Sequence, residues 1–346
     1  RNRLKQGLVG FSGRLCYALP PCHCGMLVVM CPAAPIPVRT AILLLLLLGS
    51  ASAWAETIGW AVNSRGNEID SQRVDALWRI DLETGQSEYI GWTSYLDVEG
   101  LAFNAEGDLF GADDDTKTLI KVNQTTGLGI PVGGQANRNN MELPLSENLD
   151  FGMAMDCDGQ AWVVSSAQQT LFRADLESGE LTVVAEAGSL GAPISDIAFL
   201  GDEILGIGVG LNADRTAAAP NLYSIDPQSG RANLIGPLGD AALPYFNAGL
   251  DFDDNGVLWA VTDRRAVPGG DFPSAILKID PVTARAELVA ETVIGLESLA
   301  VGPAAACELR GTVIPRPVPL LSLGALLVLT LAILMVGAVQ VRSRSA

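Results

Sequence analysis

Acid or amide side chains recur at one point of a repeated pattern in this 346-residue chain. They fall within a three-residue window just before the apolar run that opens each repeat: Glu99, Asp150, Asp196, Asn247 and Glu297. Oxygen ligands that converge on a common axis suit a hard cation such as Ca²⁺. The pattern therefore predicts a metal site at these five residues, and the alternative is a solvated acidic rim.

A second acidic stretch, Asp251-Phe-Asp253-Asp-Asn255-Gly256, matches the start of an EF-hand calcium loop. The twelfth place of that loop normally holds Glu, and here it holds Thr262. Since the flanking residues favour strands and Asp-Gly or Asn-Gly pairs favour hairpin turns, we expect a structural turn instead.

Histidine chemistry is excluded from the part of the chain that we expect to be mature. His23 is the only histidine, and it precedes the expected mature start at Glu56. Without histidine there is no Ser-His-Asp triad and no imidazole general base. No Ser-His, Cys-His, P-loop or dinucleotide fingerprint is found from Glu56 onward. We therefore assign no catalytic residue, although carboxylate–metal chemistry stays open.

The elements that must position these residues are short strands in a repeat. The phrase apolar-x-x-apolar-Asp/Asn occurs five times, as LWRIDLETGQ (77–86), LIKVNQTTGL (119–128), LFRADLESGE (171–180), LYSIDPQSGR (222–231) and ILKIDPVTAR (276–285). Period-2 alternation in short runs, bounded by Gly, Asp, Asn and Pro, is typical of antiparallel strands. Four strands in units of roughly 40–50 residues indicate β-propeller blades.

Four units are complete, at 101–133, 153–186, 197–238 and 250–292. Residues 58–92 lack a first strand, and residues 298–302 supply one with nothing after it. Strands from both ends of the repeat region would thus complete a fifth blade and remove an exposed sheet edge. The sequence predicts an all-β propeller of five blades with this shared closing blade, and six blades is the alternative.

Several polar and aromatic residues have a structural role in this scheme. Turn positions after the third strand of each blade hold Asp81, Asn123, Asp175, Asp226 and Asp280, whose side chains can bond local backbone N–H groups. Trp78, Trp162 and Trp259 fall within strands, so we expect them between blades. Residues 211–216 and 267–271 enlarge links between second and third strands, where rigid scaffolds often carry recognition loops.

The blades of residues 58–302 resemble those of exported bacterial propellers that read "LYxIDPxTG", which are quinoprotein-like and NHL-like repeats. The five-residue ring loosely resembles the channel-floor calcium site of gluconolactonase-type propellers. That resemblance implies a bound Ca²⁺ that activates a water or a substrate. A quinone cofactor is disfavoured, because nothing in the sequence marks a clamp for a planar ring.

The N-terminal part resembles an export signal. AILLLLLLGS (41–50) follows Arg39 and precedes Ala53-Trp54-Ala55, which is the layout of a secretory signal peptide with an A-x-A cleavage site. We expect residues 30–55 to be that signal, and residues 1–29 to be an over-translated or disordered leader. The predicted ectodomain covers residues 56–309, and a linker covers residues 310–317.

At the other end, residues 318–341 form an uncharged apolar stretch long enough to cross a bilayer as a helix. Arg342 and Arg344 follow in a basic tail, 342–346, which favours the cytoplasmic side. Pro319-Leu-Leu-Ser322 before the apolar run resembles the IPTL relative of PEP-CTERM sorting signals. The resemblance implies export, membrane retention and a sorting protease or transpeptidase as partner.

All 39 acidic residues lie between Glu56 and Glu308, against 13 basic residues, which leaves a formal charge of −26 there. Such a surface repels phosphate backbones, so nucleic acid is excluded as a partner, and divalent cations or cationic surfaces are favoured. Cys157 and Cys307 are the only cysteines of this region. In an oxidising compartment they are a candidate disulfide, although their distant repeats leave the pairing open.

Taken together, these patterns predict an exported, membrane-anchored β-propeller in the cell envelope, with its ectodomain outside the cytoplasm. We expect a non-catalytic binding or cell-surface structural module whose partner is a protein or polysaccharide of the envelope. The alternative is a Ca²⁺-dependent lactonase-like or esterase-like hydrolase that uses the axial carboxylates.

Overall fold

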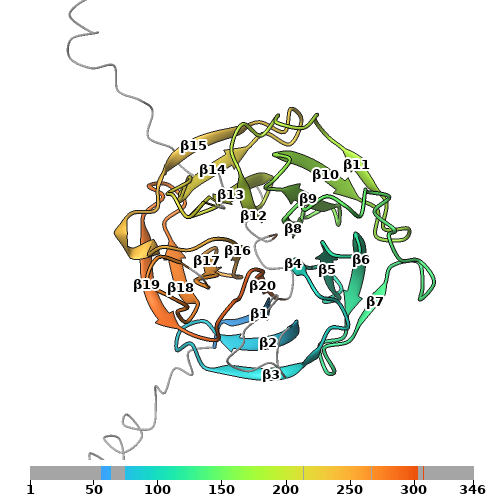
Figure 1. Cartoon of the computed structure of the whole chain (residues 1–346), viewed down its shortest axis with the longest axis horizontal. Coiled ribbons are helices and arrows are strands. Elements are labelled where there is room, and N and C mark those ends of the chain that lie inside the picture. The colour runs from blue at the N-terminus through green and yellow to red at the C-terminus, as the bar shows by residue number, and fades with distance from the viewer. Residues whose placement is uncertain (1–55, 64–74, 213, 266, 303–306, 308–346) are drawn as a thin grey trace, which may run out of the picture. The chain divides into compact units, whose positions relative to one another are not determined.

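The structure, a computed structural model, describes residues 56–63, 75–212, 214–265, 267–302 and Cys307. These residues belong to the second of the two units into which the chain divides, Ala55–Ala346. Their strands form five sheets arranged as blades around a central axis (Figure 1). The prediction of an all-β propeller with five blades is therefore confirmed, and the alternative of six blades is wrong.

Each blade is an antiparallel sheet of four strands. From the axis outward, the first two complete blades are β4 (Val98–Phe103), β5 (Leu109–Asp113), β6 (Thr118–Val122) and β7 (Gly129–Pro131), and then β8 (Phe151–Met155), β9 (Ala161–Ser165), β10 (Thr170–Ala174) and β11 (Leu181–Val183). The next two are β12 (Ile194–Leu200), β13 (Glu203–Gly208), β14 (Asn221–Ile225) and β15 (Ala232–Pro237), and then β16 (Ala248–Phe252), β17 (Leu258–Thr262), β18 (Ala275–Ile279) and β19 (Ala286–Glu291). The fifth blade consists of β20 (Ala300–Val301), β1 (Ile58–Asn63), β2 (Ala76–Asp81) and β3 (Ser87–Trp92). A short 3₁₀ helix, η2 (Asp240–Ala242), precedes β16.

The last of these blades joins strands from both ends of the repeat region. In it, Gly59 pairs with Val301 and Trp60 pairs with Ala300, so β20 becomes the innermost strand beside β1. The predicted closing blade is thus confirmed. β20 thereby covers the inner edge of β1, which would otherwise be exposed to the channel.

Turn chemistry explains why the strands end where they do. At the five predicted turns an Asx side chain accepts a backbone N–H two residues ahead, in Asp81–Glu83, Asn123–Thr125, Asp175–Glu177, Asp226–Gln228 and Asp280–Val282. Asp253 Oδ1 likewise accepts the N–H groups of Asn255 and Val257, both at 2.9 Å. The stretch that matches an EF-hand start is therefore a hairpin turn between β16 and β17, as predicted.

The hydrophobic core is divided among the seams between neighbouring blades. Five clusters of buried side chains lie there, one for each seam. The three tryptophans of the repeat are buried as expected, with Trp259 0%, Trp162 4% and Trp78 7% exposed. Inner strands such as β4 and β12 are buried throughout, whereas outer strands such as β3 are largely exposed.

Two innermost strands carry a bulge near their first residues. The pairing of β4 with β5 skips Glu99, and the pairing of β12 with β13 skips Ser195. A bulge leaves its extra residue out of the ladder and turns the side chain to a new direction. This local distortion places Glu99 at the end of the channel where the innermost strands begin.

Both targeting segments predicted from the sequence, residues 30–55 and 318–341, lie outside the described residues. Within the described part of the chain, no helix is both long and apolar enough to cross a membrane. The predicted boundaries of the leader, linker, anchor and tail stay predictions.

Candidate cation site at the channel mouth

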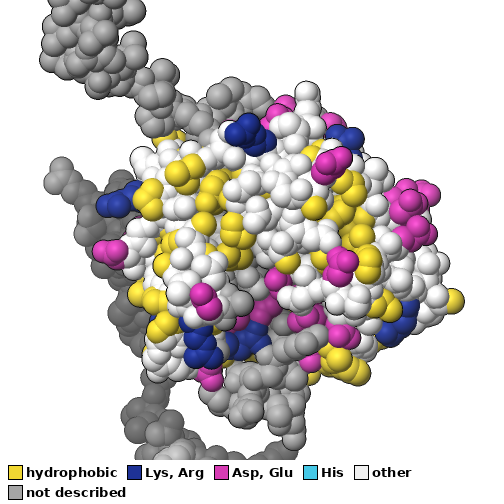
Figure 2. All heavy atoms as spheres, turned by 45° about the horizontal axis from the view of Figure 1, so that its top comes forward, with side chains coloured by type: hydrophobic (Ala, Val, Ile, Leu, Met, Phe, Trp, Pro, Cys, Tyr) yellow, Lys and Arg dark blue, Asp and Glu magenta, His cyan; other side chains and the backbone are white. Residues whose placement is uncertain are grey.

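Three buried carboxylates meet at the end of the channel where the innermost strands begin. Asp97, Glu99 and Glu297 each offer an oxygen, and these oxygens lie within 4.8 Å of one another. Each of the three side chains is less than a tenth exposed. One face of the propeller carries Asp and Glu side chains in a hollow, with basic side chains beside them (Figure 2). We call these three residues the mouth cluster.

The mouth cluster joins the two ends of the repeat region. Asp97 immediately precedes β4 and Glu99 is its second residue, whereas Glu297 comes from the segment before β20. The backbone N–H of Glu297 donates to the carbonyl of Val62 at 3.3 Å, which fixes that segment against β1. The closing blade therefore positions one of the three oxygens, and the first complete blade positions the other two.

Glu99 lies in an unfavourable environment for a negative charge. Burial raises the pKa of Glu99 well above its usual range, and the charges of Asp150, Asp97 and Asp114 raise it further. The N–H of Phe151 donates to Glu99 Oε2 at 2.7 Å, and this bond alone among the named causes lowers the pKa. A cation beside Glu99 would offset the effects of burial and of the neighbouring negative charges on the pKa, because it stabilises the ionised form.

Asp150 adjoins the cluster from the next blade. Burial and the charge of Asp114 raise its pKa, while hydrogen bonds from Asn148, Glu99 and Ser166 oppose that rise. Asp150 has a positive φ of 49°, in the left-handed region that non-glycine residues rarely adopt. Asp150 therefore adds a further acidic group beside Glu99.

Two ion pairs flank the mouth cluster. Lys117 Nζ lies 2.8 Å from Asp114 Oδ1, and both side chains are almost fully buried. On the opposite side, Arg265 makes two 2.9 Å bonds to Asp263 and also contacts Glu297 Oε1. These two cations fix the acidic groups around them, and they balance only part of the negative charge at the mouth.

The two remaining predicted ligands, Asp196 and Asn247, do not belong to the mouth cluster. Asp196 lies deeper in the channel, where its Oδ1 accepts the N–H groups of Met153 and Ile197 and its Oδ2 accepts the N–H of Leu250. These bonds make Asp196 a link between three blades. Asn247 is half-buried, and its backbone carbonyl accepts the N–H of Asp263 at 2.8 Å. The five-residue metal site stays a prediction, of which the structure brings Glu99 and Glu297 together.

The sequence patterns did not predict Asp97 as a member of the site, nor the basic side chains of Lys117 and Arg265 beside it. A signal for Asp97 was present, since Asp97-Val98-Glu99 places a second acid two residues before a predicted ligand. No comparable signal marked Lys117 or Arg265, because their acidic partners are set by loops that follow β5 and β17.

Cys157 and Cys307 form a disulfide in the structure, with 5.3 Å between their Cα atoms. Their repeats are not neighbours, but Cys157 follows the innermost strand β8 and Cys307 follows the innermost strand β20. Around a narrow axis, innermost strands of different blades finish close together. The pairing that the sequence left open is therefore decided by the ring.

Comparison with known proteins yields similar folds only. No protein-family model matches the chain, and no curated protein matches it. One similar solved structure is described as "The de novo evolutionary emergence of a symmetrical protein is shaped by folding constraints", with 16% identity over 72% of this chain and 99% of that chain and a TM-score of 0.42.

Two further structures are similar at the same level. A catalytically inactive variant of virginiamycin B lyase from Staphylococcus aureus, solved with quinupristin, has 14% identity over 68% of this chain and 71% of its own, with a TM-score of 0.38. A nidogen/laminin complex has 10% identity over 66% of this chain and 78% of that chain, with a TM-score of 0.39. These similarities carry no argument about function.

Proposed function

We propose that this chain is an exported, membrane-anchored, non-catalytic binding module whose channel mouth holds a hard divalent cation such as Ca²⁺. The observation that carries the proposal is the mouth cluster, in which three buried carboxylate oxygens lie within 4.8 Å of one another. Buried like charges are costly unless a cation compensates them. Carboxylate oxygens are the ligands that Ca²⁺ prefers.

A recognition face around that cation is supported by the topology. In an antiparallel blade the link from the second to the third strand returns to the end at which the first strand begins. The two enlarged links, β13 to β14 and β17 to β18, therefore share a face with the mouth cluster. A protein or polysaccharide of the envelope is the partner that we propose for this face.

The non-catalytic part of the proposal is supported by how the buried hydroxyl groups at the channel are used. Ser195 Oγ donates to the carbonyl of Ala248 at 3.0 Å and accepts its N–H at 2.8 Å. Ser298 Oγ accepts the N–H of Val62 at 3.0 Å. Both hydroxyls join neighbouring strands. Neither hydroxyl has a histidine partner among the described residues, and the one histidine of the chain, His23, lies outside them.

One observation favours a second candidate function, a metal-dependent hydrolase. Glu99 and Asp150 are adjacent carboxyl groups, and each has a raised pKa. A carboxyl group that keeps its proton nearer neutral pH can act as a general acid. Turnover of a lactone or phosphoester panel that is lost in Glu99→Gln would favour the hydrolase and contradict the binding module.

The decisive experiment is thermal unfolding of the full chain with excess EDTA and then with millimolar Ca²⁺ or Mg²⁺. A ligand that binds only the native state stabilises it by about 2.7 kcal/mol at one hundred times its Kd. We expect a Ca²⁺-dependent rise in Tm that disappears in Glu99→Gln/Glu297→Gln. The control Glu106→Gln/Glu287→Gln removes the same charge from exposed positions and should keep the rise. An equal Tm in all conditions would sink the cation site.

Export and anchoring rest on the sequence, and they need a separate test. Cell fractionation with protease added to intact spheroplasts should digest the propeller from the outer side of the membrane. Mass spectrometry of the recovered chain would locate both termini and show whether the tail is removed. A chain that stays in the cytoplasmic fraction would contradict this part of the proposal.

A further inference from the structure

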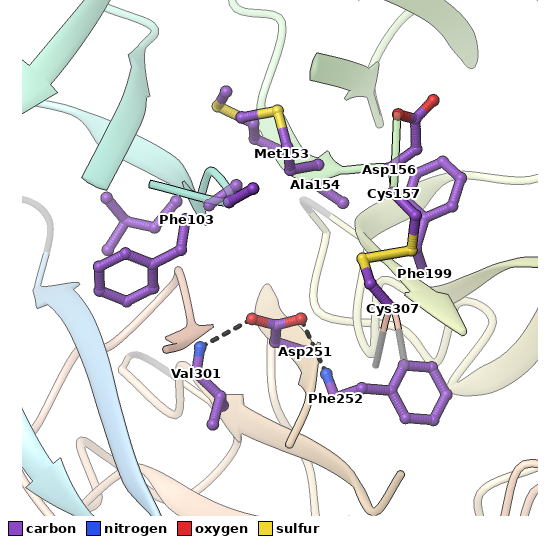
Figure 3. Close-up of a pocket in the computed structure, with 14 residues that line it drawn as sticks. Phe103, Met153, Ala154, Asp156, Cys157, Phe199, Asp251, Phe252, Val301 and Cys307 are labelled. Atoms are coloured by element: carbon purple, nitrogen blue, oxygen red, sulfur yellow. Dashed lines mark hydrogen bonds between the residues drawn. A yellow bond between two sulfur atoms is a disulfide. The ribbon is translucent and has the colours of Figure 1, made fainter. Parts of the chain in front are cut away.

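A cavity lies at the end of the channel opposite the mouth cluster, where the innermost strands finish. It has a volume of about 260 Å³. All five blades contribute to its lining, which includes Phe103, Met153, Phe199, Phe252 and Val301. The Cys157–Cys307 disulfide forms one side of it (Figure 3). This cavity is mainly apolar, in contrast to the acidic mouth cluster.

One carboxylate, that of Asp251, lies in the middle of this apolar lining (Figure 3). Its Oδ2 accepts the N–H of Val301 at 2.7 Å, and its Oδ1 accepts the N–H of Phe252 at 2.8 Å. A carboxylate can accept about four hydrogen bonds. Since Asp251 is half-buried and lines the cavity, its oxygens keep acceptor capacity on the cavity side.

Asp196 is a carboxylate on another innermost strand that has a structural role alone, and it can be compared with Asp251. Asp196 accepts three backbone N–H groups and is 0% exposed. Asp251 has the two equivalent contacts, to its own next residue and to the following innermost strand, but it has no third contact among the described residues and it borders open space. The two carboxylates therefore differ in that Asp251 faces a cavity and Asp196 does not.

The other charged groups that the described residues place around Asp251 are acids. Asp156 also lines the cavity, but its carboxylate is already bonded within its own hairpin turn. It accepts the N–H groups of Asp158 and Gln160 and the Nε1–H of Trp162. The charge of Asp253 acts on Asp251 from the β16–β17 turn. The described residues of the lining include no Lys or Arg. A ligand that enters this cavity therefore meets an apolar wall and a potential that favours a cation.

We propose that this cavity binds a small amine with an apolar body, whose ammonium group pairs with Asp251 and whose ring or alkyl chain packs against Phe103 and Met153. The size is adequate, because a dry apolar cavity of about 150 Å³ holds benzene. The remaining volume accommodates a short aminoalkyl chain. This site is separate from the mouth cluster, and its test does not depend on Ca²⁺.

The experiment uses the purified full chain and phenethylamine as the probe, at about pH 8.5. The neutral 2-phenylethanol and the anionic 3-phenylpropionate have nearly the same shape. Calorimetry should show that the amine binds at least tenfold more tightly than either analogue. Methyl resonances of ¹³C-methionine should locate it, because Met153 and Met155 line the cavity whereas the buried Met141 does not. Each resonance is assigned by a Met→Leu variant.

Two pairs of variants complete the test. Asp251→Asn should remove the preference for the amine, while Asp254→Asn removes the same charge from an exposed position and should keep it. Ala105→Trp fills the cavity from an exposed lining residue and should abolish binding, while Glu106→Trp beside it should not. Equal affinity for amine and alcohol, unshifted Met153 and Met155 resonances, or a preference that persists in Asp251→Asn would each overturn the proposal.

Discussion

The carboxylate of Asp196 accepts the backbone N–H of Leu250 at 2.8 Å, and this bond ties the innermost strand β12 to the innermost strand β16. Innermost strands of different blades have no ladder between them, since each belongs to its own sheet. Side chains must supply the polar contacts across the channel. Glu99 and Asp251 make similar bonds to the next innermost strand, to Phe151 and Val301.

Removal of the Asp196 carboxylate should therefore destabilise the whole ring. Asp196→Ala leaves three buried N–H groups without an acceptor, and each such group costs about 1–3 kcal/mol. We expect the free energy of unfolding to fall by about 3 kcal/mol or more in urea denaturation. The turn variant Asp280→Ala, which loses only exposed bonds at a hairpin, should cost about 1 kcal/mol or less. Similar losses in both variants would contradict the role of Asp196 as a link.

The pH dependence of stability should reveal Asp251. Burial raises its pKa to about 7, against the bonds from Val301 and Phe252 that lower it. Because the folded pKa lies above the unfolded one, the protonated form favours folding. That stabilisation is fully present below about pH 4 and is lost as the pH rises through about 7. The upper limit is about 4 kcal/mol for a shift of about three units.

Asp251→Asn should flatten part of this decline. Urea denaturation of the wild type and of the variant between about pH 4 and pH 8.5 measures the difference in slope. The wild type keeps a decline in any case, since the pKa values of Glu99, Asp196 and Asp113 are also raised. Parallel curves for the two proteins would show that Asp251 titrates in the folded state near its usual pKa.

The disulfide should contribute measurably to stability. Cys157 and Cys307 are separated by 150 residues in sequence, so the bond constrains a long segment of the unfolded chain. Chain-entropy arguments give about 5 kcal/mol for such a loop, and removal of native disulfides costs about 2–5 kcal/mol. We expect Cys157→Ser/Cys307→Ser to lower the urea midpoint accordingly. Reductant should lower the wild-type midpoint in the same way and leave the double variant unchanged.

A pair of glycines tests the packing between outer strands. Gly127 and Gly159 both have a positive φ, of 78° and 82°. A Cβ on Gly127 would lie 2.3 Å from the carbonyl oxygen of Gly91 in the neighbouring blade, whereas a Cβ on Gly159 would meet nothing within 4 Å. Gly159→Ala should cost about 1–2 kcal/mol from the backbone alone.

Gly127→Ala should cost at least about 2 kcal/mol more than Gly159→Ala, because the clash adds to the same backbone strain. Chemical denaturation of the two alanine variants beside the wild type gives both values. If the two substitutions lower the free energy of unfolding by the same amount, the close approach of Gly91 to Gly127 is not a fixed feature of the native state.

The sequence by itself determined the local features of this protein. Alternating apolar residues and the Asx turns at positions such as Asp81 and Asp280 depend on neighbours within a few residues, so their spacing was enough to predict strands, blades and the closing blade. The burial of Trp259 followed for the same reason, because strand periodicity fixes which side a residue faces.

Only the tertiary structure decided which polar groups meet. It brought Asp97 and Glu99 to Glu297, about 200 residues away, and it separated Asp196 from them by using its oxygens for backbone bonds. It also joined Cys157 to Cys307 and enclosed Asp251 in an apolar cavity. These outcomes depend on the closure of the ring, on depth along the channel and on a bulge at Glu99. Repeat spacing carries no information about such small displacements, because a shift of one residue leaves the pattern intact but moves a carboxylate to another partner.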